Sequence, residues 1–245
     1  MSVYALVGKK LGHSFSKAWF TAKFEREGRV DDRYENIELE QIASLPEAVE
    51  RYGLSGFNVT IPYKTAILPY LDDLSPAARE TGAVNTVQII QGKMTGHNTD
   101  VIGFDVTLQP LLRPYHTAAL ILGTGGAAKA VAYVLRRRGI EYRYVSRTGD
   151  GREILRYDKL TMLDVRNAGI IINTTPLGMY PDADALPDIP YEGVDKYHLL
   201  YDLIYNPSET RFMKQGVLYG AATVNGYNML IRQAMESWNI WQNNV

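Results

Sequence analysis

The sequence predicts an α/β protein with two domains, and three observations support that fold class. Short apolar runs alternate with helical patterns from Val3 to Ile61, and a second alternation begins at Thr117. Between the two, apolar residues at helical spacing from Gly103 to Leu111 indicate a connecting helix. Because strands that alternate with helices form parallel βαβ units, we expect two mostly parallel sheets rather than one continuous sheet.

The predicted division returns to the first domain at the end of the chain. We expect residues 1–103 and 226–245 in the first domain and residues 104–225 in the second. Apolar residues at helical spacing from Asn228 to Trp241, after Gly226, predict the C-terminal helix that returns to the first domain.

In the first half, strands are expected at Val3 to Val7, Tyr34 to Leu39 and Gly56 to Ile61, and helices at Ser16 to Gly28, Ile42 to Gly53, Pro62 to Leu71 and Pro76 to Thr81. Val84 to Ile90 and Lys93 to Asn98 flank Gln91-Gly92, which predicts a hairpin and an antiparallel edge. Arg113-Pro114 ends the connecting helix.

In the second half, strands are expected at Thr117 to Leu122, Tyr142 to Ser146, Gly169 to Asn173 and Leu199 to Ile204, with a helix at Ala127 to Arg138. The sequence between Thr148 and Ala168 is too broken for a full-length helix, so we expect a shortened βαβ unit there.

Composition excludes several functional classes. The chain of 245 residues has a net charge of -1, which gives no electrostatic case for nucleic acid binding. It has no cysteine, so disulfides, thiol catalysis and cysteine-ligated metals are excluded. The first residues predict a strand rather than a signal peptide, and no apolar run reaches membrane-spanning length. We therefore expect a cytoplasmic protein in which any redox chemistry comes from a bound cofactor.

A glycine-rich segment follows the first strand of the second domain. In Gly123-Thr124-Gly125-Gly126-Ala127-Ala128, the first glycine permits a tight turn, Gly125 lets the backbone approach a phosphate, and Ala128 provides a small residue where the helix packs on the strand. A turn that binds nothing is the alternative. The strand and helix around it favour a Rossmann-type domain with a dinucleotide at the helix start.

About twenty residues later, Ser146-Arg147-Thr148 stands where an NAD site needs an acidic residue. A carboxylate there would accept a hydrogen bond from the adenosine ribose 2′-hydroxyl, whereas an arginine with two hydroxyls suits a 2′-phosphate. An exposed surface arginine is the alternative. The segment predicts NADP(H) as the cofactor.

The segment from Asn58 to Lys64 joins a strand to a helix. Asn58 and Thr60 are expected to point to the same face, and Pro62 suits a first helical turn. Lys64 would then lie in the first turn of the helix from Pro62 to Leu71, where the helix dipole lowers its basicity. Such a lysine can act as an acid or a base near neutral pH, although an exposed helix lysine is the alternative.

Asn98-Thr99-Asp100 is expected to end the second hairpin strand. Polar residues at the carboxyl end of a strand are where α/β sheets bind ligands, and a capping turn is the alternative. If Asp100 lies beside Lys64, its carboxylate tunes the lysine, so that either protonation state is reachable. His13 and His97 have no second ligand at metal-binding spacing, so no metal site is expected.

The glycine segment and seven other short sequence motifs together resemble the shikimate dehydrogenase family. They occur in the order typical of the family, from residue 8 to residue 241. Besides the glycine segment, they are Gly12-His13-Ser14-Phe15-Ser16, Asn58 to Lys64, Gly82-Ala83-Val84-Asn85-Thr86, Asn98-Thr99-Asp100, Asn173 to Met179, Asp202 to Pro207, and Asn225-Gly226 through Gln233. The resemblance implies NADPH-dependent reduction of 3-dehydroshikimate to shikimate, a step in aromatic amino-acid biosynthesis.

The resemblance also implies a role for each matching residue. Lys64 and Asp100 match the catalytic pair. The substrate-binding residues would be Ser14, Ser16 and Tyr205 at the carboxylate and Asn58, Thr60, Asn85 and Gln233 around the ring hydroxyls and carbonyl. The cofactor-binding residues would be Gly123, Thr124, Gly125, Gly126, Ala127, Ser146, Arg147 and Thr148, with Thr174, Leu203, Gly226 and Met229 on the nicotinamide side.

Some positions depart from the family pattern: Lys17, Lys129, Ser146 and Asn228 replace its usual proline, arginine, asparagine and glycine. Arg152 lies one residue later than the family's second arginine and is a further cofactor candidate. Two alternative functions stay open, an NAD-using quinate/shikimate dehydrogenase and a non-catalytic binding protein on the same fold. Arg147 argues against the first, and the presence of both Lys64 and Asp100 argues against the second. We expect a monomer or a homodimer.

Overall fold

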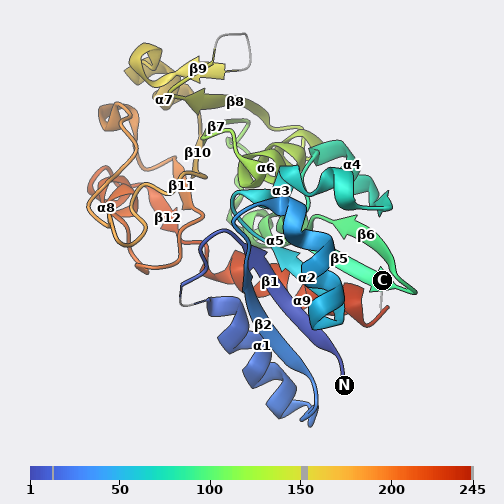
Figure 1. Ribbon diagram of the computed structural model, residues 1–245. Helices are drawn as coiled ribbons and strands as arrows, with labels where there is room; N and C mark the ends of the chain where they lie inside the picture. Colours follow the sequence, from blue (N-terminus) through green and yellow to red (C-terminus); the bar gives the residue numbers. More distant parts are fainter. Residues whose placement is uncertain (13, 150–153, 244–245) are drawn as a thin grey trace. The chain divides into compact units, whose positions relative to one another are not determined.

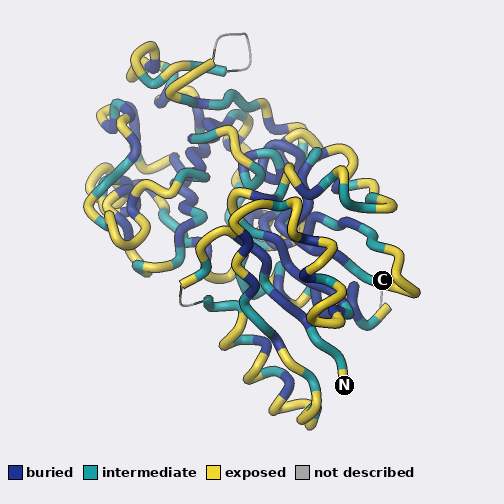
Figure 2. Tube along the Cα trace, in the orientation of Figure 1, coloured by how far each residue is buried: buried dark blue, intermediate teal, exposed yellow. Residues whose placement is uncertain are grey.

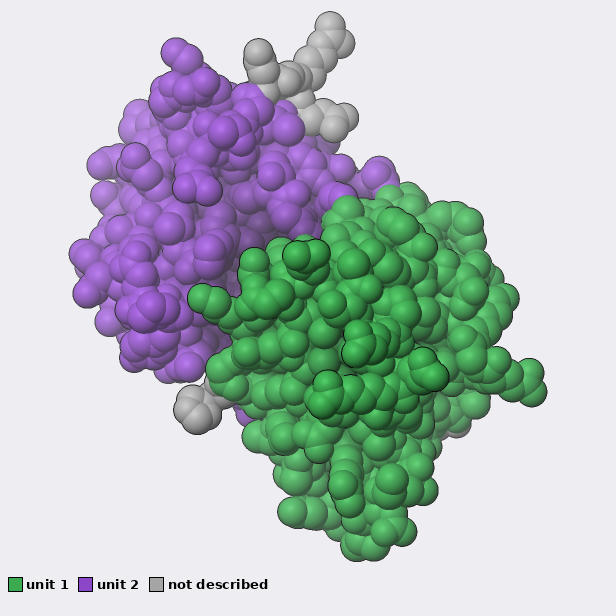
Figure 3. All heavy atoms as spheres, in the orientation of Figure 1, with its two compact units in different colours: residues 1–99, 233–245 green, residues 100–232 purple. Residues whose placement is uncertain are grey.

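The computed structural model describes residues 1–12, 14–149 and 154–243 (Figure 1). The chain forms two compact units (Figure 3), which we call unit 1, residues 1–99 and 233–245, and unit 2, residues 100–232. The division falls inside two helices, α5 (Thr99–Leu108) and α9 (Tyr227–Trp241). The expected domains, residues 1–103 with 226–245 and residues 104–225, were defined by the substrate and cofactor that each is expected to bind. That division stays a prediction.

Unit 1 contains one six-stranded sheet in the order β2-β1-β3-β5-β6-β4. The strands are β1 (Val3–Gly8), β2 (Arg33–Glu38), β3 (Leu54–Val59), β4 (Asp73–Leu74), β5 (Thr86–Ile90) and β6 (Lys93–His97). β1 pairs in parallel with β2 and β3, whereas β5 is antiparallel to β3 and β6. The expected hairpin is confirmed, because Gln91 and Gly92 both have positive φ and Ile90 pairs with Lys93.

The two faces of this sheet bury different side chains. The helices besides α5 and α9 are α1 (Phe15–Arg26), α2 (Leu45–Tyr52), α3 (Tyr63–Ala66) and α4 (Pro76–Thr81), with 3₁₀ turns at Ile42–Ser44 and Leu68–Tyr70. Ala5 and Val7 of β1 belong to one apolar cluster with Leu45 of α2. Tyr4 belongs to another cluster, with α1 and with Trp238 of α9. Successive side chains of β1 point to opposite faces of the sheet, and each face is covered by one of these clusters. Most of β1 is therefore buried, as the dark blue in Figure 2 shows.

Gly56 shows why β3 accepts a glycine on the face toward α9. A Cβ there would lie 2.5 Å from Trp241 Nε1 and 3.0 Å from Val87 O. The indole Nε1 donates a hydrogen bond of 2.9 Å to Val87 O. The missing side chain therefore makes room for the tryptophan that attaches the end of α9 to the sheet.

Unit 2 contains a fully parallel six-stranded sheet in the order β12-β11-β10-β7-β8-β9. Its strands are β7 (Ala118–Leu122), β8 (Glu141–Ser146), β9 (Ile154–Arg156), β10 (Ile170–Asn173), β11 (Leu199–Asp202) and β12 (Ala222–Val224). Its helices, besides α5 and α9, are α6 (Gly126–Arg137), α7 (Met162–Asn167) and α8 (Arg211–Leu218), with 3₁₀ turns at Gln109–Leu111, Tyr157–Lys159 and Tyr191–Gly193. The expected second α/β unit is confirmed, including its shortened part, where α7 has only six residues.

The connecting helix begins earlier than expected, which corrects the interpretation of Asn98-Thr99-Asp100. β6 ends at His97, and Thr99 and Asp100 form the first turn of α5 instead of the end of a strand. The reason is a cap from a distant residue: Asn85 Oδ1 accepts a hydrogen bond of 2.7 Å from Thr99 N. This satisfies an N–H of the first turn, and the helix then continues through Gly103.

The helix expected from Pro62 to Leu71 is also corrected. Only Tyr63–Ala66 is α-helical, Pro62 is its N-cap residue, and Leu68–Tyr70 is a 3₁₀ turn that contains Pro69. Proline inside a helix removes a donor and clashes with the preceding turn, so the helix cannot extend. A four-residue helix aligns too few peptide dipoles for the expected effect on Lys64. The dipole argument for that lysine therefore fails.

Candidate active site

The expected site residues are divided between the two units. Unit 1 holds Ser14, Ser16, Asn58, Thr60, Lys64, Asn85 and Gln233. Unit 2 holds Asp100, Tyr205 and the expected cofactor residues, namely Gly123, Thr124, Gly125, Gly126, Ala127, Ser146, Arg147, Thr148, Thr174, Leu203, Gly226 and Met229. His13 and Arg152 lie outside the described residues.

The glycine segment follows β7 at the point where the strand order of unit 2 reverses. β7 pairs with β10 on one side and β8 on the other, so the ends of β7 and β10 form the switch point where such sheets bind ligands. Gly123 has a φ of +108°, and a Cβ there would lie 2.8 Å from Thr174 Oγ1. The tight turn thus requires glycine, and it brings two of the expected residues together.

The start of α6 fits a pyrophosphate. Gly125 is the N-cap residue, and no side chain caps the helix. A Cβ built on Gly125 has no atom within 4 Å, so the space in front of the first turn is open. Helix N-termini present N–H groups and a positive dipole end, both of which favour a phosphate. These residues therefore fit a dinucleotide cofactor.

Arg147 lies at the end of β8, beside the expected position of the adenosine ribose. Its side chain is exposed, and no carboxylate among the described residues forms an ion pair with it. Ser146 accepts a hydrogen bond of 3.4 Å from Thr148 N. Burial raises the pKa of Tyr157 to about 12, while the charge of Arg147 opposes this rise. The Arg147 side chain is therefore exposed at the end of β8.

The end of β11 brings a second group of expected residues together. A Cβ on Gly226 would overlap the carbonyl of Leu203, so only glycine fits there. Gly226 N donates a hydrogen bond of 2.9 Å to Ile204 O, and Met229 is buried in the first turn of α9. Leu203 and Gly226 are therefore in direct backbone contact.

Asp202 holds the residues around this strand end. Its carboxylate accepts hydrogen bonds from Asn173 Nδ2 at 3.0 Å, from Ile204 N at 3.0 Å and from Thr210 Oγ1 at 2.6 Å. Burial raises the pKa of Asp202 to about 6, despite these three donors. Sequence reasoning used this residue only as part of a family motif. Its contacts make it the structural support of the Leu203 segment.

We expect Asp202→Asn to remove one component of the pH dependence of stability. The folded-state pKa of about 6 lies above the ordinary value of 3.8, so the contribution of Asp202 is full below that ordinary value and is lost as the pH rises through about 6. Asparagine is neutral and can keep contacts of the same shape. The difference in unfolding free energy between the variant and the unmodified chain should therefore shift in favour of the variant by roughly 1.4 kcal/mol between about pH 5 and about pH 8. This is the free energy that corresponds to one pKa unit.

Urea denaturation at several pH values measures this effect. Asp184→Asn is a matched control, because Asp184 is highly exposed and lies in the same unit. If the Asp202→Asn curve runs parallel to that of the unmodified protein, then Asp202 does not titrate in this range and the interpretation is wrong.

Two of the three expected carboxylate-binding residues, Ser14 and Ser16, lie at the start of α1. Ser14 is the N-cap residue, and its Oγ accepts a hydrogen bond of 3.3 Å from Lys17 N. Burial raises the pKa of Tyr34, and a hydrogen bond with the Ser16 side chain opposes this rise. Ser16 therefore contacts Tyr34, a residue that sequence reasoning did not select. Tyr205 in unit 2 is half-buried, and burial raises its pKa.

The backbone ties Lys64 to the segment that carries Asn85. Val84 N donates a hydrogen bond of 2.7 Å to Lys64 O, and Val59 N donates one of 2.8 Å to Asn85 O. Thr60, the next residue, donates from its N–H to Val7 O at 2.9 Å. The end of β3, the single turn of α3 and the start of β5 are therefore held together, and Lys64 is half-buried among them.

A buried hydrogen-bond network surrounds three of the expected substrate-binding residues. Asn58 Nδ2 donates to Ser237 Oγ at 2.9 Å and to Thr86 Oγ1 at 3.0 Å, and its Oδ1 accepts from Tyr34 at 2.8 Å. Asn85 Nδ2 lies 3.5 Å from Gln233 Oε1. Tyr34 and Ser237 were missed because no motif contains them, and Thr86 stands in the Gly82 to Thr86 motif but was given no role. The only signal was the presence of polar side chains at otherwise apolar positions.

The described residues contain no group of three or more histidines, cysteines or acidic residues that could hold a metal. His97 is half-buried, burial lowers its pKa, and its Nε2 has no hydrogen-bond partner among the described residues.

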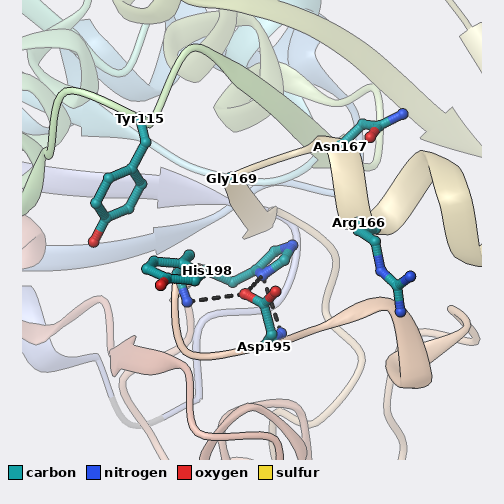
Figure 4. Close-up of a pocket in the computed structure, with 7 residues that line it drawn as sticks. Tyr115, Arg166, Asn167, Gly169, Asp195 and His198 are labelled. Carbon is teal, nitrogen blue, oxygen red and sulfur yellow. Dashed lines mark hydrogen bonds and ion pairs between the residues drawn. The ribbon is translucent and has the colours of Figure 1, made fainter.

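A pocket of about 380 Å³ lies at the amino ends of the unit 2 strands, whereas the glycine segment lies at their carboxyl ends (Figure 4). Tyr115, Gly169 and His198 line it, and they come just before β7, β10 and β11. His198 Nδ1 lies 2.8 Å from Asp195 Oδ1, which is one of the contacts drawn in the figure. Because α/β sheets bind their ligands at the carboxyl ends of the strands, this pocket is separate from the expected cofactor residues.

Comparisons with known proteins agree in pointing to one family. A family model described as the shikimate dehydrogenase substrate binding domain matches residues 6–87. A curated protein of Clostridium beijerinckii, named shikimate dehydrogenase (NADP(+)), is 37% identical over 99% of this chain and 92% of its own length.

Two solved structures have the same fold. Shikimate dehydrogenase 1 from Peptoclostridium difficile is 36% identical, with a TM-score of 0.87 over 99% of this chain and 92% of that one. Shikimate 5-dehydrogenase from Thermus thermophilus, solved with NADP(H) and shikimate, is 32% identical, with a TM-score of 0.87 over 99% of this chain and 94% of that one. Among the described residues, no helix has the length and apolar character needed to cross a membrane.

Proposed function

The chain belongs to the shikimate dehydrogenase family, and we propose that it catalyses the reversible, NADPH-dependent reduction of 3-dehydroshikimate to shikimate. This reaction is a step in aromatic amino-acid biosynthesis. The observation that carries the proposal is the full-length similarity to a curated NADP(+)-dependent relative, together with the presence of Lys64 and Asp100 in this chain.

We propose that unit 2 binds the cofactor. The uncapped start of α6 and the open space at Gly125 support pyrophosphate binding there. Arg147, with Ser146 and Thr148, is proposed to bind the 2′-phosphate, since a guanidinium forms strong charge-assisted hydrogen bonds with phosphate oxygens. Thr174, Leu203, Gly226 and Met229 are proposed to surround the nicotinamide, where the bound cofactor supplies the hydride.

Lys64 and Asp100 are proposed as the proton-transfer pair. When a ketone is reduced, negative charge develops on its oxygen, and a proton donor positioned at that atom lowers the barrier. The Lys64 ammonium would donate this proton at the carbonyl oxygen, with Asp100 as the second member of the pair. In the oxidative direction, the same pair would remove the proton of the hydroxyl. Asp100 is almost fully buried, which suits a carboxylate that acts on a neighbouring group.

Short polar side chains are proposed to recognise the substrate. Ser14, Ser16 and Tyr205 would bind the carboxylate, and Asn58, Thr60, Asn85 and Gln233 would bind the ring hydroxyls and carbonyl region. A site built to hydrogen-bond a hydroxyl rejects an analogue that lacks it, because its own buried polar groups would be left unpaired. The family model that matches residues 6–87 supports a substrate-binding role for unit 1.

Steady-state kinetics with shikimate and quinate, each against NADP+ and NAD+, test the proposal. We expect shikimate with NADP+ to have the highest kcat/KM of the four pairs. Turnover of quinate with NAD+ at the highest rate would favour the quinate/shikimate alternative, and no turnover of any pair would favour a binding protein.

Location in the cytoplasm, a monomeric or homodimeric state and the absence of a nucleic acid partner stay predictions, and light scattering measures the oligomeric state.

A further inference from the structure

The Ser237 hydroxyl on α9 has several hydrogen-bond partners, although its single proton can be donated to only one of them. Its Oγ donates to Gln233 O at 2.9 Å and lies 2.9 Å from Asn58 Nδ2 and 2.8 Å from Thr86 Oγ1, with Thr99 Oγ1 as its most distant neighbour at 3.3 Å. A hydroxyl donates once and accepts up to twice. The backbone carbonyl of Gln233 can only accept, so the Ser237 proton goes to it, and Ser237 accepts from Asn58 and Thr86. The fully buried hydroxyl is then saturated.

This arrangement determines which way the Asn58 amide points. Its NH₂ group faces Ser237 and Thr86, and also Asn85 O at 3.3 Å, which is another atom that can only accept. If the amide turned over, its oxygen would face Asn85 O, and two acceptors would then lie side by side. Ser237 could donate a hydrogen bond to the turned oxygen only by breaking its hydrogen bond to Gln233 O. The proton of Thr86 would help little, because its shortest contact is Ser237 Oγ at 2.8 Å, and Thr99 Oγ1 at 3.2 Å and Asn85 Oδ1 at 3.3 Å are further acceptors for it.

The orientation decides what Asn58 can offer to a ligand. Both hydrogens of its NH₂ group are used inside unit 1, by Ser237 and Thr86. Its Oδ1 accepts one hydrogen bond, from the Tyr34 hydroxyl at 2.8 Å, and an amide oxygen has two lone pairs. What remains is a single acceptor. Asn58 can therefore bind a hydroxyl group, which donates, but not a carbonyl or a carboxylate, which only accept.

We infer that Ser237 is a positioning residue for substrate recognition, because its hydroxyl holds the Asn58 amide with Oδ1 toward the hydroxyl groups of the substrate. The inference rests on the proposed function, in which Asn58 belongs to the substrate-binding residues. Ser237 acts through Asn58, with no contribution to hydride or proton transfer. In Ser237→Ala, the Thr86 proton is released and can stabilise the turned amide, so the acceptor is lost part of the time.

The expected result for Ser237→Ala is a KM for shikimate raised about 5- to 10-fold, the effect of one hydrogen bond, with kcat and the KM for NADP+ within about twofold of the unmodified enzyme. In an Asn58→Ala background, the same substitution should leave the KM for shikimate unchanged, because the side chain through which Ser237 acts is gone. Ser237→Cys, which replaces the hydroxyl with a somewhat larger thiol that is only a weak donor and acceptor, is a second variant and should shift KM in the same direction.

Thr107→Val is the matched control. Thr107 also donates to the carbonyl four residues earlier, Gly103 O at 2.7 Å, and lies in unit 2 outside the proposed site. It should lower the melting temperature without raising the KM for shikimate. The inference is overturned if Ser237→Ala lowers the melting temperature and leaves KM unchanged, or raises KM equally in both backgrounds. Failure of the proposed function is a separate result, the absence of shikimate turnover by the unmodified enzyme.

Discussion

Lys64→Ala is expected to lower kcat for shikimate oxidation by about 10²- to 10⁴-fold, the usual contribution of a positioned general acid or base. The physical reason is that the substitution removes the lysine amine, the member of the proposed pair that would accept the hydroxyl proton in this direction. Steady-state kinetics measure kcat, and calorimetric titration with shikimate measures binding. Binding should stay largely intact, because several other polar side chains are proposed to hold the substrate.

Lys93→Ala is the matched control for this substitution. Lys93 is an exposed lysine of the same unit, at the tip of the β5–β6 hairpin, and its removal takes away the same charge. Its kcat should equal that of the unmodified enzyme within about twofold. Unchanged turnover in Lys64→Ala would remove Lys64 from the mechanism. A loss of binding as large as the loss of kcat would instead make it a substrate-binding residue.

The parts of the fold that were predictable from the sequence are those with local signals. β7 and β10 are buried on both faces, so they appear in the sequence as continuous apolar runs. Gly123 was expected to form a tight turn, and its φ of +108° confirms this. The beginning of α7 also has a local signal, a capping box between Thr161 and Asp164, although it was not used.

The features that were not predictable depend on residues far apart in the chain. The start of α5 at Thr99 is capped by Asn85, and the Asn58 amide is held by Ser237, which is 179 residues away. No spacing rule connects such pairs, because the contact exists only after the sheet and α9 have formed. For the same reason, the sequence showed Asn58 as part of a motif but did not show which of its atoms remain for a ligand.

Arg147→Ala is expected to lower kcat/KM for NADP+ by roughly 10- to 150-fold and to leave kcat/KM for NAD+ nearly unchanged. A hydrogen bond to a charged group contributes about 1.5–3 kcal/mol, and each 1.4 kcal/mol is a factor of ten. NAD+ has no 2′-phosphate and therefore loses no contact. The effect for NADP+ should also decrease as salt is added, because Arg147 is exposed and its attraction to the phosphate is screened.

Arg136→Ala separates the loss of this contact from the loss of a positive charge. Arg136 lies in the last turn of α6, at the opposite end of the helix from the glycine segment, and its substitution should change neither cofactor. Inhibition by adenosine 2′,5′-bisphosphate gives a second measurement that involves no hydride transfer, and only Arg147→Ala should weaken it. If NADP+ and NAD+ lose the same factor in Arg147→Ala, the arginine supports the adenosine pocket without binding the 2′-phosphate, and the selection of NADP+ must come from Ser146, Thr148 or another residue of unit 2.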